Sequence, residues 1–214
     1  MNKKRFITPL TALIIGILLD SAGVAFITKS NLGVTSVSAI PYIFQEILPS
    51  LSYGTWYYIF QISLMLILII ATGRWKKDYL ISFLTGFFFS LVLDAASFLI
   101  RPLPVTIPHR TLYFLTGTLL LMCGVAFLIN SRLPIMPADM FTREYSAFRN
   151  IPYRKFKTAF DITCVIITTI LSFLFMGTLI GISIGTFIGA FINGIGIAYF
   201  KDLQCKYLSF ENIS

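Results

Sequence analysis

Residues 23–26, Gly23-Val24-Ala25-Phe26, return unchanged as Gly124-Val125-Ala126-Phe127. Further identical or similar residues keep nearly the same spacing: Gly16 and Gly117, Leu32-Gly33-Val34 and Leu133-Pro134-Ile135, Tyr53 and Tyr153, Phe60 and Phe160, Ile62 and Ile162, Gly86 and Gly185, and Asp94 and Asn193. We therefore predict two related halves, residues 1–105 and 106–214. The alternative is a chance alignment, since Gly, Phe and Ile are frequent in this chain.

The composition places both halves in a membrane. Of the 214 residues, 57% are hydrophobic and only 12% are charged, and the mean hydropathy is +0.84. Soluble domains carry about 25% charged residues, so this chain has too few polar groups to cover a water-facing surface. A soluble domain is therefore excluded, and the length leaves room for roughly six to eight apolar spans of about 20 residues.

Six segments are long and apolar enough to cross a bilayer: 8–28, 55–73, 78–100, 111–129, 156–176 and 178–200. Two shorter stretches, 31–49 and 133–150, are interrupted by prolines and charges. The second contains Asp139, Arg143 and Glu144, and three charges at the centre of a bilayer would cost on the order of 8 kcal/mol. We therefore predict an all-α integral membrane protein with six transmembrane helices and two short non-spanning helices.

The distribution of cations supports six crossings. The formal charge is +8, from 17 Lys and Arg against 9 Asp and Glu, and cations gather in the cytoplasmic loops of membrane proteins. With six crossings and a cytoplasmic N-terminus, 14 of the 17 lie in cytoplasmic segments, namely residues 3–5, 74–77, 132–157 and 201–206. Only Lys29, Arg101 and Arg110 remain outside. Both chain ends are predicted in the cytoplasm, and the basic charge indicates orientation and not a nucleic-acid partner.

Three spans in each half give the halves opposite orientations, as in an inverted-topology 3+3 repeat. The short stretches then enter from opposite faces. Thr35 and Ser36 are N-cap candidates for the first, and Pro137 and Asp139 suit the first turn of the second. As re-entrant half-helices, they would direct two positive N-termini at an anion or a polar headgroup near the midplane. As interfacial helices, they would instead lie among the lipid headgroups.

Polar residues in or beside the spans form the predicted site. Asp20 lies past the middle of the first span, and an acid inside the membrane is a functional candidate by default. Asp94 and Asn193 would occupy symmetric positions around a central site, or Asp94 would be solvated at the interface. The predicted substrate-binding residues are Asp20, Thr35, Ser36, Asp94, Asp139, Arg143 and Asn193.

Other polar residues have structural interpretations. Lys157 and Asp161 are interpreted as an ordinary i,i+4 ion pair. The last span carries small residues that indicate a packing face, or a solute passage. The glycines are Gly181, Gly185 and Gly189, and the passage would be lined by Ser183, Thr186 and Asn193. His109 lies in a Pro-rich loop without nucleophile or metal-ligand spacing, so we expect no enzyme, no metal and no cofactor.

Three stretches also carry a family likeness. They are Gly23-Val24-Ala25-Phe26 with Asn31-Leu32-Gly33, Leu133-Pro134-Ile135-Met136-Pro137-Ala138-Asp139 with Thr142-Arg143-Glu144, and Lys157-Thr158 and Asp161 with Gly181-Ile182-Ser183-Ile184-Gly185-Thr186. In these stretches the chain resembles the YitT/YczE family of bacterial multi-pass membrane proteins, in particular its YczE branch. The resemblance implies a bacterial plasma-membrane protein, and some relatives are linked to secondary-metabolite production. It implies no substrate.

These observations predict a small secondary transporter or permease for an unidentified small polar or anionic solute, bound at the interface between the repeats. Two alternatives are a non-transporting partner that docks a cytosolic biosynthetic enzyme through residues 149–157, and a substrate-binding subunit of an ATP-driven vitamin importer. The expected partners are membrane lipid, the solute, and either a second copy of the chain or a membrane or cytosolic protein.

Overall fold

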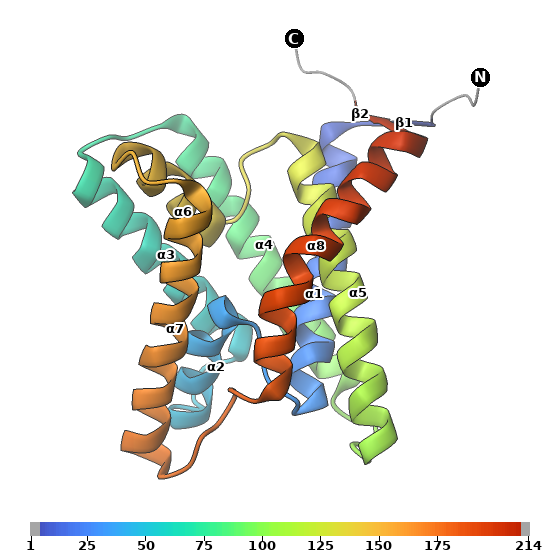
Figure 1. Cartoon of the computed structure of the whole chain (residues 1–214), viewed down its shortest axis with the longest axis vertical. Helices are drawn as coiled ribbons and strands as arrows, with labels where there is room; N and C mark the ends of the chain where they lie inside the picture. Colours follow the sequence, from blue (N-terminus) through green and yellow to red (C-terminus); the bar gives the residue numbers. More distant parts are fainter. Residues whose placement is uncertain (1–4, 211–214) are drawn as a thin grey trace.

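The computed structural model describes residues 5–210. The helices of this range are α1 (Pro9–Ser30), α2 (Ser36–Ile47), α3 (Tyr53–Thr72), α4 (Lys77–Ile100), α5 (Ile107–Ser131), α6 (Pro137–Phe148), α7 (Tyr153–Met176) and α8 (Ile184–Tyr207). Two strands that the sequence did not predict, β1 (Arg5–Ile7) and β2 (Leu208–Phe210), pair in parallel. They hold the two ends of the described chain together (Figure 1). The cations Lys3 and Lys4 lie outside the described residues.

Six helices, α1, α3, α4, α5, α7 and α8, are long and apolar enough to cross a membrane. Their exposed faces carry large apolar side chains such as Leu66, Phe98 and Phe191, which suit contact with lipid. The chain is therefore a multi-pass membrane protein, as its composition predicts. Helices α2 and α6 have 12 residues each, which is too short to cross about 30 Å of hydrocarbon.

The last span differs from the predicted range of 178–200. Helix α8 begins only at Ile184. Gly177 ends α7 in the left-handed conformation with φ of 68°, and Gly181 has φ of 79°, so non-helical chain connects the two helices. Gly181 therefore does not share a helix face with Gly185, and the predicted stripe of glycines is shorter than expected. The other five spans begin and end within about four residues of their predicted bounds.

Helices α1 and α5 pack against each other at glycine residues. A Cβ atom on Gly23 would lie 2.5 Å from the main-chain nitrogen of Leu121 and 2.7 Å from the oxygen of Gly117. A Cβ atom on Gly124 would lie 2.5 Å from the nitrogen of Asp20. Only glycine allows two helix backbones to approach this closely, so the spacing of small residues in the two spans determines the crossing.

The other helices form two groups around this crossing. The core group consists of α1, α4, α5 and α8, in which α4 packs against α1 and α8 packs against α5. The outer group consists of α2, α3, α6 and α7, in which α2 packs against α7 and α3 packs against α6. Helix α3 also packs along α4, whereas α7 and α8 diverge upward from the segment that joins them (Figure 1).

Both short helices begin inside the protein. Ser38 and Ala39 in α2 and Ala138 in α6 are buried. The main-chain nitrogen of Val34 donates a hydrogen bond of 2.8 Å to the oxygen of Gly181. On the other side, the Ser82 hydroxyl donates to the oxygen of Ile135 at 2.5 Å. The first contact holds the residues before α2 against the segment that precedes α8. The second holds the residues before α6 against α4.

Candidate functional site

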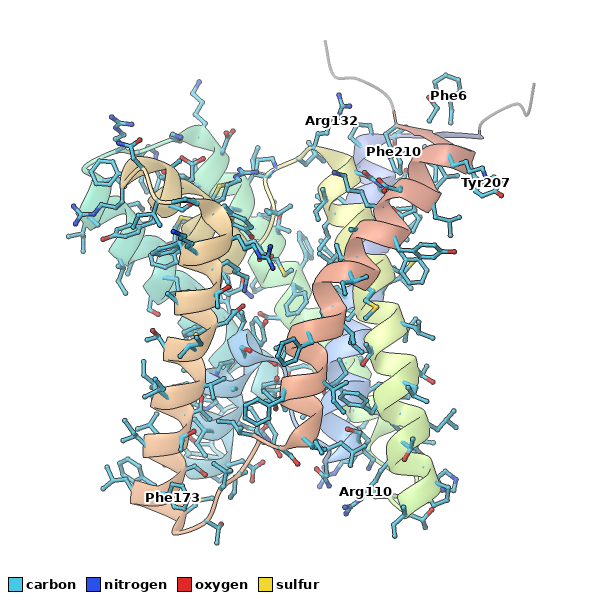
Figure 2. The ribbon with its side chains drawn as sticks, in the orientation of Figure 1. Phe6, Arg110, Arg132, Phe173, Tyr207 and Phe210 are labelled. Atoms are coloured by element: carbon cyan, nitrogen blue, oxygen red, sulfur yellow. The ribbon has the colours of Figure 1, made fainter. Side chains whose placement is uncertain are left out.

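A cavity of about 270 Å³ lies between the end of α5 and the first turns of α6 and α7. Its lining residues are Leu128, Ile129, Arg132, Leu133, Ile135, Asp139, Arg143 and Tyr153. Figure 2 places Arg132 at the end of the molecule where Phe6 and Phe210 lie, and Arg110 at the opposite end. The mixture of apolar walls with a few charged and hydroxyl groups is typical of a site for a small polar molecule.

Helix α6 presents two charged residues, Asp139 and Arg143, to this cavity. Pro137 suits the first turn, and Asp139, also in the first turn, is placed where a carboxylate is stabilised by the helix dipole. Arg143 follows Asp139 by four residues and therefore lies on the same face. The guanidinium of Arg143 donates a hydrogen bond of 3.2 Å to the sulfur of Met140, a weak acceptor, and it forms no ion pair with any described residue.

The carboxyl group of Asp139 is influenced by charges on α7. Burial raises its pKa, the charge of Lys157 lowers it, Asp161 raises it and Arg143 lowers it. Lys157 donates a hydrogen bond of 2.6 Å to Asp161. Lys157 and Asp161, which the sequence analysis interprets as an ordinary i,i+4 ion pair, therefore lie near Asp139 of the predicted site.

Asp20 lies deeper, on α1. It is only 4% exposed, and it has no hydrogen bond or ion pair with any residue from 5 to 210. Asp139 acts on it electrostatically, and both carboxyl groups act on Tyr57 of α3. The structure therefore brings Asp20, Asp139 and Arg143 of the predicted set into one region.

Gln61 follows Tyr57 by four residues on α3 and therefore lies on the same face of that helix. It is fully buried, and neither its amide oxygen nor its amide nitrogen has a hydrogen-bond partner among the described residues. A Cβ atom on Gly86 would lie 2.7 Å from the Gln61 oxygen and 2.9 Å from Pro137, so Gln61 reaches the start of α6. We call Asp20, Tyr57, Gln61 and Asp139 the central polar cluster.

Two other predicted residues meet elsewhere. Thr35 and Asn193 line a second cavity of about 10 Å³, the volume of one water molecule, together with Thr118 and Thr186. The Thr118 hydroxyl and the Asn193 amide oxygen have no hydrogen-bond partner in the described chain. Thr35 also caps α2, because its hydroxyl accepts from the main-chain nitrogen of Ser38 at 3.4 Å.

The last two predicted residues stand apart from both cavities. Ser36 is the first residue of α2 and lines neither of them. Asp94 accepts hydrogen bonds from the Ser52 hydroxyl at 2.5 Å and from the Gly54 nitrogen at 2.7 Å. Asp94 therefore binds the first turn of α3 to α4, and it does not form the symmetric pair with Asn193 that the alignment suggested.

The sequence interpretation missed Tyr57, Gln61, Lys157 and Asp161 as neighbours of the site. The signal was present in the repeat, because an offset of 100 pairs Tyr57 with Lys157 and Gln61 with Asp161. It also pairs Tyr53 with Tyr153, which was noted only as evidence for the repeat. Polar residues at equivalent positions of two repeats are a sign of a shared central site. These polar pairs were less evident in the alignment than the identical apolar pairs.

The comparisons with known proteins give a family and no activity. A family model described as "Family of unknown function (DUF6198)" matches residues 7–202. No curated protein and no solved structure matches the chain.

Proposed function

We propose a function for this chain, which belongs to DUF6198, a family of unknown function. The proposed function of the protein is that of a small secondary transporter, which moves a small polar or anionic solute through the cavity between the core group and the outer group. The observation that carries the proposal is a difference between the region beside α6 and the region beside α2. An inverted repeat makes these two regions equivalent, but the first is open and the second is closed.

Three pairs of contacts support the inverted repeat. Gly16 lies against Gly124 as Gly23 lies against Gly117, which is what a two-fold axis between α1 and α5 requires. The Lys29 ammonium donates to the oxygen of Arg101, and the equivalent Asn130 amide donates to the oxygen of Lys201. The contact of Val34 with Gly181 corresponds to the contact of Ile135 with Ser82. These pairs lie far apart in the sequence, so a chance alignment would not produce them.

The open region is the cavity beside α6, and its equivalent beside α2 is filled. The repeat maps Asp139, Arg143 and Tyr153 onto Ser38, Tyr42 and Tyr53. The rings of Tyr42 and Tyr53 meet edge to face with centroids 5.8 Å apart, and the Tyr53 hydroxyl donates to the oxygen of Ser38 at 3.4 Å. A Cβ atom on Gly181 would lie 2.7 Å from the Tyr42 ring, so this ring also closes against the segment before α8.

A transporter needs a site that is accessible from one side at a time, and this arrangement supplies it. In the proposed orientation the cavity faces the cytoplasm of a bacterial cell, because β1, β2, residues 74–77 and residues 149–157 lie at its end of the molecule (Figure 1). The side chains at the cavity suit an anionic or zwitterionic group, since Arg143 offers several unsatisfied donors and Asp139 offers a carboxyl group. The proposal includes the interpretation of α2 and α6 as re-entrant half-helices.

Transport can be tested without knowing the substrate. Purified protein in liposomes of bacterial phospholipid is exposed to a ¹³C-labelled mixture of organic acids, amino acids and phosphate esters, and the vesicle contents are measured by mass spectrometry. At least one compound should accumulate above protein-free vesicles, and Arg143→Gln should reduce its uptake at least tenfold while the loop variant Arg149→Gln does not. Identical contents in all vesicles would overturn the proposal.

A second candidate function is the docking of a cytosolic enzyme. Arg149 at the end of α6 and Arg154 and Lys155 in the first turn of α7 are exposed. Lys157, which belongs to the same sequence cluster, instead pairs with Asp161. An exposed basic segment suits an acidic protein surface. Replacement of the three exposed cations by Gln should abolish co-purification of such an enzyme without affecting solute uptake, and unchanged co-purification would remove this candidate.

A further inference from the structure

The central polar cluster contains a carboxyl group with no balancing partner. Asp20 is 4% exposed at the centre of the helix bundle, and no described residue donates a hydrogen bond to it or forms an ion pair with it. A carboxylate inside a membrane protein is normally paired, solvated in a cavity or neutralised. The structure contains the acid without its counter-charge.

The surrounding elements do not supply that charge. Towards α5, the main chain of Asp20 lies against Gly124, which has no side chain, and towards α4 its neighbour Ser21 donates to the main-chain oxygen of Phe89. From α6 the facing group is Asp139, a second acid, and from α3 it is the hydroxyl of Tyr57. No titratable group of α4 or α5 acts on Asp20 within the described range.

The nearby cations do not pair with Asp20, because one is bound to another acid and the other is exposed. Lys157 is bound to Asp161 at 2.6 Å, so this pair is neutral as a unit. Arg143 is exposed in the open cavity. The buried part of the site therefore contains two carboxyl groups, those of Asp20 and the partly buried Asp139, and neither forms an ion pair with a described residue.

Unsatisfied oxygen atoms complete the arrangement. Gln61 is fully buried with an unpartnered amide oxygen, and it reaches Pro137, two residues before Asp139. A buried amide without partners is rare in proteins, and a bound ion or water molecule would satisfy it. The structure holds no group of three or more His, Cys, Asp or Glu among residues 5–210 that would favour a multivalent metal.

We propose that Asp20 binds one monovalent cation, a sodium ion or a proton, and that this cation is coupled to solute movement. The proposal deepens the transporter function and rests on it for the coupling, while the binding itself does not. Oxygen atoms of Asp139, Tyr57 and Gln61 are the neighbouring groups that would share a sodium ion with Asp20, since hard cations prefer carboxylate and carbonyl oxygen.

The position of Asp20 explains how binding would affect transport. Asp20 belongs to α1 of the core group, while Tyr57, Gln61 and Asp139 belong to α3 and α6 of the outer group. Two acids that face each other across this boundary repel, and a bound cation reverses the interaction. Cation binding therefore favours one relative position of the two groups over another, which is the requirement for coupling.

The test measures cation binding directly. The unfolding temperature of the purified protein in detergent is recorded in sodium chloride and in N-methylglucamine chloride at equal ionic strength, between pH 5 and pH 9. A sodium site predicts an unfolding temperature that rises with the logarithm of sodium concentration. A proton site predicts no effect of sodium and a stability that falls as pH rises, because the folded protein holds a proton that the unfolded chain releases.

Asp20→Asn should abolish whichever dependence is found, whereas the matched control Asp94→Asn should lower the unfolding temperature and keep the dependence. The same sodium and pH response in wild type and Asp20→Asn would overturn the proposal. If Asp20→Asn does not fold, the wild type alone decides through reaction with dicyclohexylcarbodiimide, which modifies protonated carboxyl groups. Modification at Asp20 that sodium suppresses supports a sodium ion, and sodium-independent modification that declines with rising pH supports a proton.

An absence of modification at Asp20 at every pH and sodium concentration would overturn the proposal in that experiment. The outcome is separable from the transport function. Solute uptake without a cation response at Asp20 removes the inference and keeps the transporter. A cation response without uptake of any labelled compound removes the transporter and keeps the cation site.

Discussion

Under the proposed inverted repeat, the two halves of the chain differ at the positions where their short helices meet the core group. Beside α2, Tyr42 and Tyr53 pack against each other and against the segment before α8. Beside α6, the equivalent Arg143 and Tyr153 line an open cavity. Under the proposed repeat, the contact of Val34 with Gly181 is equivalent to that of Ile135 with Ser82, so side chains beside these contacts contribute to the difference in opening.

A second difference concerns the long helices. Helix α3 packs along α4, and Asp94 of α4 binds the first turn of α3 through Ser52 and Gly54. In the other half α7 and α8 diverge, and Asn193 in place of Asp94 lines the small cavity instead. Asp94 therefore joins α3 to α4, whereas Asn193 forms no hydrogen bond that joins α8 to α7 in the described chain.

The largest expected effect follows from breaking the crossing on which the comparison depends. In Gly23→Ala the new methyl group meets main-chain atoms of α5, which cannot move independently. We expect a loss of about 3 kcal/mol in the free energy of unfolding, at the upper end of the range for overpacked sites. Gly194→Ala is the matched control, because no atom lies within 4 Å of its Cβ position, and it should be neutral or stabilising. Equal effects of the two variants would contradict the close crossing.

The next prediction exchanges the residues that distinguish the two halves. Arg143→Tyr gives α6 the residue of α2 and should close the cavity, while Tyr42→Arg should open the opposite region. The measurement is the rate at which a membrane-impermeant maleimide labels Ile135→Cys in a protein without Cys123, Cys164 and Cys205. We expect labelling in the Arg143→Tyr background to be at least tenfold slower, a difference of about 1.4 kcal/mol in accessibility. An unchanged rate would show that residue 143 does not determine the opening.

A smaller effect is expected at Gln61 and its repeat partner Asp161. The Gln61 amide has no partner, so Gln61→Leu should raise the free energy of unfolding in sodium-free buffer by about 1 kcal/mol. Asp161→Leu should lower it by roughly the same amount, because Lys157 would lose its ion-pair partner in a partly exposed site. Chemical denaturation of the two variants checks the signs. A destabilised Gln61→Leu would mean that the amide is satisfied in the protein.

The sequence predicted the six long helices, their approximate ends and the two short helices, because apolar length and proline or charge interruptions are local signals. It did not predict the break between residues 177 and 183, since Gly177 and Gly181 look like packing residues until their backbone angles are known. Asp20, Asp139 and Arg143 were predicted as site residues on chemical grounds, and the structure brings them together. Asp94 was predicted to lie opposite Asn193 at a central site, and the sequence did not indicate its hydrogen-bond partners Ser52 and Gly54, because these depend on how two helices pack.

The smallest effect concerns pH, and it distinguishes Asp139 from Ser38, its uncharged equivalent in α2. Burial raises the pKa of Asp139 in the folded protein, and the charges of Lys157 and Arg143 partly oppose that rise. A folded carboxyl group with a raised pKa binds more protons than the unfolded chain, so its contribution to stability is complete below about pH 4 and decreases as pH rises through the folded pKa. Asp139→Asn should therefore remove part of the decline in unfolding free energy above pH 4, and Ser38→Ala should leave that decline unchanged. Denaturation curves at several pH values would measure both slopes. A steeper decline in Asp139→Asn than in wild type would mean that Lys157 and Arg143 outweigh burial, and that α6 holds its acid in the charged form.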